Sequence, residues 1–315
     1  MKQPIFLTPT FQERIWGGEN LRKLYHYEIP SEHTGECWAI SAHPNGQSVV
    51  KSGRFEGKNL SQLWSEYPEL FGHYESDHFP LLTKILDAND DLSIQVHPND
   101  SYARQFENCE LGKTECWYII DCAEDAEIII GHHAQTKEEF MHLIENNQWD
   151  ELLQREKIKP GDFFYVPSGT IHALCKGIIV LETQQSSDTT YRVYDYDRPS
   201  PSGDKRELHL EKAVAVMTVP HVAKKVEPKV WEMDEATITT FVEDRYFTVY
   251  KWEVHSRLEL VQDQHFMIVS VLEGEGTLEV NRHVYPIDKG QHFILPYRIE
   301  NFVLNGNMSL IVSHP

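Results

Sequence analysis

The sequence lacks the marks of a membrane or secreted protein. No apolar run approaches the ~20 residues that a membrane-spanning helix needs. The first seven residues become polar too soon to serve as a secretory signal. The five cysteines are odd in number and form no C-x-x-C pair, which favours reduced thiols over a disulfide framework. We therefore expect a cytoplasmic protein with no membrane partner.

Positive charge is also scarce. The chain has 29 Lys and Arg against 49 Asp and Glu, a formal net charge of -20 at pH 7. Long-range repulsion of this size argues against nucleic acid or an anionic membrane surface as a partner. An anionic small molecule would need a local cluster of basic side chains to bind.

What the chain does contain is an ordinary globular composition, with 40% hydrophobic and 25% charged residues. Its 315 residues suffice for two domains. Short runs of β-branched and aromatic residues, separated by Gly, Pro, Asn and Asp, predict a mainly β fold. The expected strands cover 79–86, 92–96, 116–120, 127–130, 162–166, 178–183, 247–254, 266–272, 277–280 and 308–312. Helices are expected only near 60–70, 136–144 and 208–217, the second starting with a capping box from Thr136 to Glu139.

A faint internal repeat suggests how the chain is divided. Two segments share the spacing from a glycine to a proline and on to one further residue: Gly161, Pro167 and His172, then Gly290, Pro296 and Asn301. The pattern resembles the second motif of cupin jelly rolls, in which the His binds a metal. We therefore predict two tandem cupin-like jelly-roll β-domains with a few short helices. The expected division is a catalytic, metal-binding domain over 1–220 and a metal-free domain over 221–315.

Strand alternation places candidate metal ligands side by side. Residues two apart in a strand point to the same side, so Gln95 projects with His97 and Lys113 with Glu115. With His172, these segments offer two imidazoles, one carboxylate and one amide oxygen. Such a set suits Zn²⁺ and leaves a position open for water or substrate. A site with one anionic ligand keeps net positive charge, which can polarise a carbonyl and stabilise an enediolate.

Several motifs occur in a familiar order along the first two-thirds of the chain. They are Trp16–Gly18, 80–88, 92–98, 112–115, 169–172, and Ser187 and Asp188 with Arg192. In this arrangement the chain resembles the type I mannose-6-phosphate isomerases, in the short form found in bacteria. The heptapeptide Leu-Ser-Ile-Gln-Val-His-Pro at 92–98 is highly specific to that family. The final third matches only in its β character.

The resemblance implies one Zn²⁺ per chain and the interconversion of mannose-6-phosphate and fructose-6-phosphate. The residues that match the family's zinc ligands are Gln95, His97, Glu115 and His172. Lys84, Lys113 and Arg192 match basic residues that line the substrate pocket, and Glu182 matches a pocket glutamate. This basic set would supply the local positive cluster that a sugar phosphate requires.

Glu182, Lys113 and Arg192 are the expected catalytic residues. Glu182 is the leading candidate for the base that moves a proton between C1 and C2, since a carboxylate in a partly dry pocket can have a raised pKa. A zinc-assisted hydride shift stays open. Beyond Arg192 the sequence departs from the longer family members, so no role carries over to Asp195 or Arg198.

Two other functional classes stay open. The chain could be another cupin metalloenzyme, such as an iron oxygenase, although Gln95 in place of His argues against redox iron. It could also be a non-catalytic sugar-phosphate-binding protein on the same scaffold. The sequence does not give the oligomeric state. His132 and His133 have no ligand spacing, and we expect both at the surface.

Overall fold

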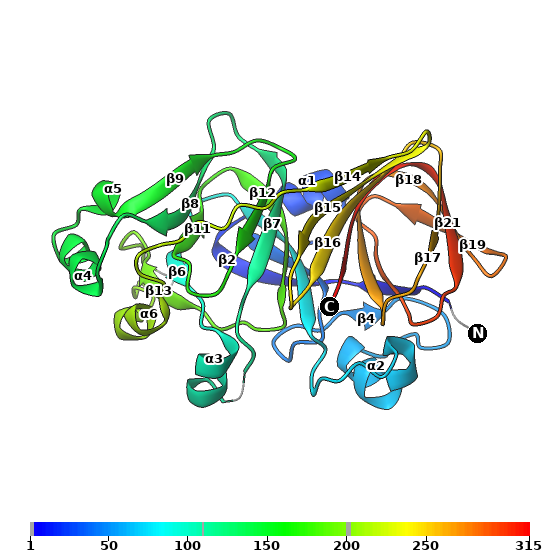
Figure 1. The fold of residues 1–315 in the computed structure, drawn as a ribbon, viewed down its shortest axis with the longest axis horizontal. Coiled ribbons are helices and arrows are strands. Elements are labelled where there is room, and N and C mark those ends of the chain that lie inside the picture. Colours follow the sequence, from blue (N-terminus) through cyan, green and yellow to red (C-terminus); the bar gives the residue numbers. More distant parts are fainter. Residues whose placement is uncertain (1–2, 109, 200–202) are drawn as a thin grey trace.

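The computed structural model describes residues 3–108, 110–199 and 203–315. These residues form a mainly β fold of antiparallel sheets (Figure 1), which confirms the predicted fold class. Among them, no helix is long and apolar enough to cross a membrane.

Two of the sheets lie in the N-terminal two-thirds of the chain. The five-stranded sheet has the order β13 (Tyr191–Tyr194), β6 (Ile94–Val96), β11 (His172–Leu174), β8 (Glu127–His132) and β9 (Leu153–Lys157). The six-stranded sheet has the order β10 (Phe163–Val166), β7 (Glu115–Cys122), β12 (Ile178–Gln185), β5 (Leu81–Ala88), β3 (Thr34–Ile40) and β2 (Thr10–Gly18). Every predicted strand in this part overlaps an observed one.

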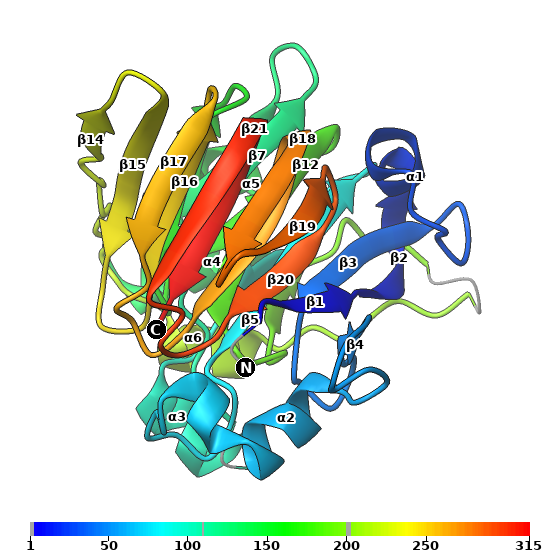
Figure 2. The ribbon, with the colours of Figure 1, turned by 90° about the vertical axis from the view of Figure 1, so that its right-hand side faces the viewer.

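The third sheet has ten strands. Its main path is β14 (Lys229–Glu232), β15 (Ala236–Glu243), β16 (Thr248–Val254), β21 (Asn301–His314), β18 (Met267–Val280), β20 (His292–Leu295), β1 (Ile5–Thr8) and β4 (Val49–Val50). Off this path, β17 (Arg257–Val261) pairs with β21 and β19 (His283–Asp288) with β18. Figure 2 shows β1 beside β20, and the register joins Ile5 to Ile294. Strands β1 and β4 therefore complete a sheet whose other strands all follow residue 220.

The helices are short. They are α1 (Asn20–Tyr25), α2 (Leu60–Glu66), a 3-10 turn (Pro68–Phe71), α3 (Asp100–Phe106), α4 (Lys137–Glu145), α5 (Trp149–Leu152) and α6 (Leu210–Val216). Pro68 separates the predicted helix at 60–70 into two pieces. The Thr136 hydroxyl caps α4 by accepting from the Glu139 N–H, but the Glu139 carboxylate accepts from Gln135 N instead of Thr136 N. The predicted capping box is therefore only half formed.

Side-chain alternation in the six-stranded sheet builds two separate cores. One face, which includes Trp117 and Val180, packs towards the five-stranded sheet around Ile128. The opposite face, which includes Leu181, packs against the ten-stranded sheet around Phe247. A third core fills the other side of the five-stranded sheet under α4, α5 and α6. The space between the five- and six-stranded sheets is where the predicted site residues lie.

The sequence repeat corresponds to repeated local structure. Gly161 and Gly290 have φ values of 93° and 83°, a conformation that favours glycine, and each precedes a four-residue strand, β10 or β20. The last residue of each copy begins the next strand: buried His172 in β11 and exposed Asn301 in β21. The two copies thus share a turn and strand but differ in the residue at the ligand position.

One surface prediction was wrong. His132 is buried, and its Nε2 lies 3.0 Å from the Thr218 carbonyl oxygen. The segment after α6 covers His132, and the alternation of side chains within one strand does not indicate such a contact.

Candidate active site and metal centre

Facing strands bring the predicted metal ligands together. His172 is directly paired with Gln95 across β11 and β6, and Glu115 begins β7 in the opposite sheet. Ligand atoms of His97, Glu115 and His172 all lie within 4.8 Å of one another. The Gln95 amide nitrogen lies 3.3 Å from His172 Nε2. All four residues predicted from sequence therefore meet at one point.

Hydrogen bonds fix the two imidazoles in the tautomer that a metal needs. His97 Nδ1 lies 2.9 Å from the Thr189 carbonyl and His172 Nδ1 lies 2.9 Å from the Thr170 carbonyl. A carbonyl only accepts, so each Nδ1 carries the proton and each Nε2 keeps its lone pair. Both Nε2 atoms face Glu115, at 3.4 Å from its carboxylate oxygens.

The unmet polar atoms of this cluster fit a divalent cation. His97 Nε2 and both Glu115 oxygens are buried, and none of them has a hydrogen-bond partner in the part of the chain that the structure describes. Such groups are costly to bury unless they are paired or coordinate a metal. Burial, followed by Lys113, lowers the pKa of His97 to about 3, which keeps the imidazole neutral, as ligation requires. A mixed set of imidazole and carboxylate donors suits Zn²⁺.

A cavity of about 360 Å³ opens beside the cluster. Its basic lining residues are Arg14, Lys84, Lys113, Arg192 and Arg206. Its acidic ones are Glu36, Glu182 and Asp188. The cavity thus contains the local cluster of basic side chains that an anionic ligand requires, although the chain as a whole is strongly negative.

Glu182 is held by one oxygen and free at the other. Its Oε2 accepts from Trp117 Nε1 at 3.0 Å, whereas Oε1 is buried without a hydrogen-bond partner. Burial, followed by the nearby Glu115 charge, raises the pKa of Glu182 to about 7, against the opposing effect of Lys113 and Lys84. A carboxylate of this kind can take up and release a proton near neutrality.

Lys84 and Lys113 are buried cations with acidic neighbours. Lys84 Nζ lies 3.8 Å from Glu182 and 3.9 Å from Glu36. Lys113 Nζ lies 3.3 Å from Glu115. Burial alone would lower the pKa of Lys113, but Glu115 and then Glu182 outweigh it and hold that pKa above its usual value.

Arg192 differs from the other cavity cations because no carboxylate of the described residues lies within 4.0 Å of its guanidinium. Its Nη1 donates to the Glu207 carbonyl at 2.9 Å, and its Nε is buried without a partner. Burial and then the Arg206 charge lower the pKa of Arg192, yet an arginine remains charged at neutral pH. Its positive charge is therefore left for a ligand.

Other charged residues of the cavity were not predicted from the sequence. Arg14, Glu36 and Arg206 lie outside the quoted motifs, and each reaches the cavity only through tertiary packing. Asp195, which had no assigned role, accepts from Arg206 Nε at 2.6 Å and from Arg198 Nη2 at 2.7 Å. The one sign in the sequence was that Glu36 and Trp38, two residues apart on β3, point to the same side of the strand. That sign does not show whether Glu36 lines a cavity or forms an ion pair elsewhere.

Comparison with known proteins agrees with this geometry. Residues 5–147 match the family model "Phosphomannose isomerase type I, catalytic domain" and residues 237–315 match "Mannose-6-phosphate isomerase, cupin domain". The mannose-6-phosphate isomerase ManA of Bacillus subtilis (strain 168) is 55% identical over 312 residues, covering 99% of each chain. The chain belongs to the type I mannose-6-phosphate isomerase family. It is accordingly an enzyme, with a cupin fold.

Further family relatives match along the whole chain. A mannose-6-phosphate isomerase of Streptococcus mutans is 51% identical over 314 residues, covering 100% of this chain and 99% of the relative. The crystal structure of mannose 6-phosphate isomerase from Bacillus subtilis superposes with a TM-score of 0.98 at 56% identity, with full coverage of both chains. A zinc-bound mannose 6-phosphate isomerase shares the fold, with a TM-score of 0.80 at 16% identity over 99% of each chain.

Proposed function

We propose that this isomerase interconverts mannose-6-phosphate and fructose-6-phosphate with one bound Zn²⁺. The observation that carries the proposal is the meeting of three features at one cavity, two within it and the metal-ligand cluster beside it. These are a metal-ligand cluster, a carboxylate with a free oxygen, and an arginine without a carboxylate partner. The first two suit proton transfer next to a carbonyl, and the third suits a phosphate.

The ligands would be His97, Glu115 and His172, with Gln95 as the fourth, each held by its strand. Bound there, zinc would act as a Lewis acid that polarises a carbonyl oxygen. The chain itself contributes the fixed imidazole tautomers and buried donor atoms described above. Lys113 sits beside Glu115 as a buried cation and adds positive charge on the side where negative charge develops.

Glu182 is the proposed base. In the open-chain aldose, removal of the proton on C2 leaves its electron pair in a C1–C2 double bond. The carbonyl π pair moves onto O1, a proton passes from the O2 hydroxyl to O1, and return of the first proton to C1 gives the ketose. The Oε1 of Glu182 makes no hydrogen bond within the described residues and is available for this transfer, while Trp117 holds the other oxygen in place. The same group serves both directions, since a base that has taken the proton becomes the acid that returns it.

Arg192 is the proposed contact for the phosphate. Its guanidinium is partly buried, and no carboxylate of the described residues lies within 4.0 Å of it, so a phosphate would supply charge-assisted hydrogen bonds. Lys84 lies across the cavity between two carboxylates and is the proposed contact for the sugar hydroxyls near the reacting carbons.

We further propose that the catalytic unit covers 1–220 and that 221–315 form a metal-free unit, because Asn301 occupies the position of His172 and is exposed. A cytoplasmic location is proposed on the basis of the free thiols of Cys37, Cys116, Cys122 and Cys175. A small sugar phosphate is the proposed partner.

A coupled assay tests the reaction and the metal together. Purified protein receives mannose-6-phosphate, and fructose-6-phosphate formation is followed before chelation, after chelation and after addition of Zn²⁺ or Fe²⁺. We expect activity to disappear on chelation and to return with zinc. Binding of the sugar phosphate without turnover by the zinc-loaded protein would identify a binding protein, and recovery with iron alone would identify a different metalloenzyme.

A further inference from the structure

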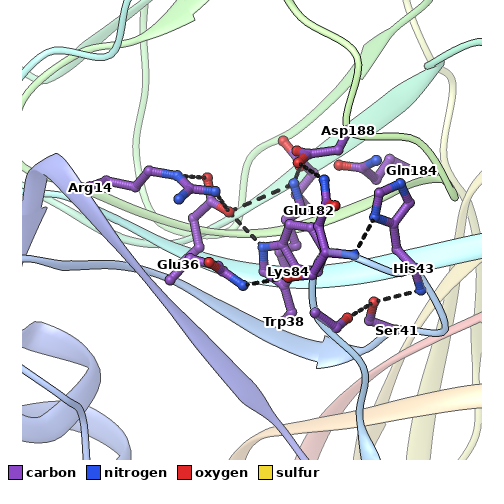
Figure 3. Close-up of polar contacts among 12 residues, drawn as sticks. Arg14, Glu36, Trp38, Ser41, His43, Lys84, Glu182, Gln184 and Asp188 are labelled. Atoms are coloured by element: carbon purple, nitrogen blue, oxygen red, sulfur yellow. Dashed lines mark hydrogen bonds and ion pairs between the residues drawn. The ribbon is translucent and has the colours of Figure 1, made fainter. Parts of the chain in front are cut away.

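Glu36 lines the cavity from β3, which β5 and β12 separate from the Glu115 strand β7 in the six-stranded sheet. Arg14 Nε and Nη2 donate to its two oxygens at 3.1 Å each, and Trp38 Nε1 donates to Oε2 at 2.6 Å. Figure 3 shows the Glu36 carboxylate between Arg14 and Lys84. A bidentate arginine and an indole fix both the position and the orientation of this carboxylate.

Lys84 makes no hydrogen bond within the described residues that would fix its ammonium. Its Nζ lies beyond hydrogen-bond distance of both flanking carboxylates, at 3.8 and 3.9 Å, and 4.8 Å from the centroid of the Trp38 ring. The ammonium is therefore held by charge on two sides and by an aromatic face on a third. Its N–H donors remain available to a ligand in the cavity.

The two carboxylates beside Lys84 differ in one decisive respect. Glu182 has an oxygen without a partner, whereas every oxygen of Glu36 is engaged. Burial alone would raise the pKa of Glu36, but Lys84 and Arg14 outweigh it and the pKa lies below its usual value. Glu36 therefore stays an anion, while Glu182 is free to change its protonation state.

We propose that Glu36, anchored by Arg14 and Trp38, is a positioning residue that holds the Lys84 ammonium in place, directed towards the reacting part of the substrate. When Glu182 takes a proton it ceases to be a counter-charge for Lys84. Of the two carboxylates that the described residues place within 4.0 Å of Lys84 Nζ, Glu36 is the one that remains an anion, and Asp188 acts on Lys84 only from farther away. The ammonium thus keeps its position at the moment when negative charge develops on the sugar oxygens. This inference rests on the proposed function, because it assigns Glu182 the role of base.

The test compares Glu36→Gln with Glu259→Gln, which breaks the exposed Arg257–Glu259 pair at 2.8 Å on β17. The glutamine keeps the shape of Glu36 and an acceptor for Trp38 but removes the charge. We expect a fall in kcat of roughly 10- to 100-fold, with KM for mannose-6-phosphate and zinc content near wild type. Glu259→Gln should leave kcat unchanged. Glu36→Asp, which restores the charge at shorter reach, should recover part of the lost kcat.

A second measurement follows the reactivity of Lys84 in the absence of substrate. Labelling by an amine-reactive reagent, followed residue by residue by mass spectrometry, reports how readily the Lys84 amine reacts, and an amine that is no longer held in place should react faster. We expect faster labelling of Lys84 in Glu36→Gln and an unchanged rate in Glu259→Gln. An unchanged Lys84 rate together with wild-type kcat would overturn the inference, as would loss of kcat that merely follows loss of zinc or of thermal stability.

The two failures can be told apart. If the wild-type protein does not isomerise mannose-6-phosphate, the proposed function fails, and the labelling rates still decide whether Glu36 controls Lys84. If the wild-type protein is active and Glu36→Gln matches it in both kcat and the labelling rate of Lys84, the proposed function stands and the role of Glu36 is rejected.

Discussion

At the scale of single residues, Glu182 gives the sharpest prediction. Glu182→Gln keeps the side-chain shape and an acceptor for Trp117 but cannot accept a proton. We expect loss of isomerisation and of exchange of the C2 proton with solvent, with zinc still bound. Solvent-exchange NMR and metal analysis on the same sample measure both. Turnover that survives in the variant would remove Glu182 from the role of base and favour the hydride shift.

The raised pKa of Glu182 also sets the direction of the pH dependence. A base works when deprotonated, so kcat should fall as the pH drops through that pKa, which is about 7 in the metal-free chain. The Glu115 charge is one cause of the rise, and bound zinc offsets it. The acid limb of the zinc-loaded enzyme is therefore expected below pH 7. A pH–rate profile of kcat checks this, and a rate that rises on acidification would contradict it.

Arg192 supplies a prediction about substrate recognition. Arg192→Met removes the cavity arginine that has no carboxylate within 4.0 Å among the described residues. Hydrogen bonds to charged groups contribute about 1.5–3 kcal/mol, so kcat/KM for mannose-6-phosphate should fall by roughly 10- to 100-fold. Slow turnover of unphosphorylated mannose, measured beside it, should change little. An equal loss with both sugars would show that Arg192 does not contact the phosphate.

The residue scale also shows what sequence can locate. Gln95, His97, Glu115 and His172 could be found because strand alternation and a specific heptapeptide fix which side chains point together. Glu36 and Arg14 could not, because their roles depend on the pairing of β2 with β3 and of β3 with β5. An isolated glutamate next to an apolar strand carries no mark of the lysine that packs against it.

At the scale of elements, the runs of β-branched and aromatic residues placed only part of the strands. Nothing in the sequence predicted β1 to β4 or β13 to β15, and the runs at 266–272 and 277–280 belong to the single strand β18. Some short helices were missed as well. α3 has a cap visible in sequence, since the Asn99 side chain accepts from Tyr102 N at 3.0 Å. α1 has no side-chain cap hydrogen bond, and nothing in its sequence separates it from a loop. Tertiary contacts of Leu21 and Tyr25, both buried, stabilise it instead.

The repeated glycine turns give a prediction at this scale. Gly161 has φ of 93° and no atom within 4 Å of where a Cβ would lie, so Gly161→Ala introduces backbone strain without a clash. We expect a loss of about 1–2 kcal/mol in the free energy of unfolding, measured by urea denaturation. Gly161→Asn should lose less, because asparagine tolerates this conformation. If Gly161→Ala and Gly161→Asn lose the same free energy of unfolding, the loss does not come from the positive φ at this position.

At the scale of the whole molecule, the six-stranded sheet is shared between two cores. One of its faces builds the cavity and the other packs against the ten-stranded sheet, which also takes in β1 and β4 from the start of the chain. The sequence repeat predicted two related β units but not this contact, because alternation in a strand shows which residues are buried and not what buries them. The two units are therefore expected to unfold together.

Phe247→Ala tests that coupling. Phe247 on the ten-stranded side is fully buried, and its ring centroid lies 6.2 Å from that of Tyr165 in β10. Removing a buried phenylalanine costs about 3–5 kcal/mol, and the cavity would open between the sheets, away from the metal ligands. If the sheets form one cooperative body, the variant should keep a single unfolding transition at a lower denaturant midpoint. Zinc release should coincide with it, and kcat per bound zinc should stay near wild type below the midpoint. Two separate transitions, with zinc retained through the first, would show instead that the ten-stranded sheet folds on its own and only rests against the catalytic one.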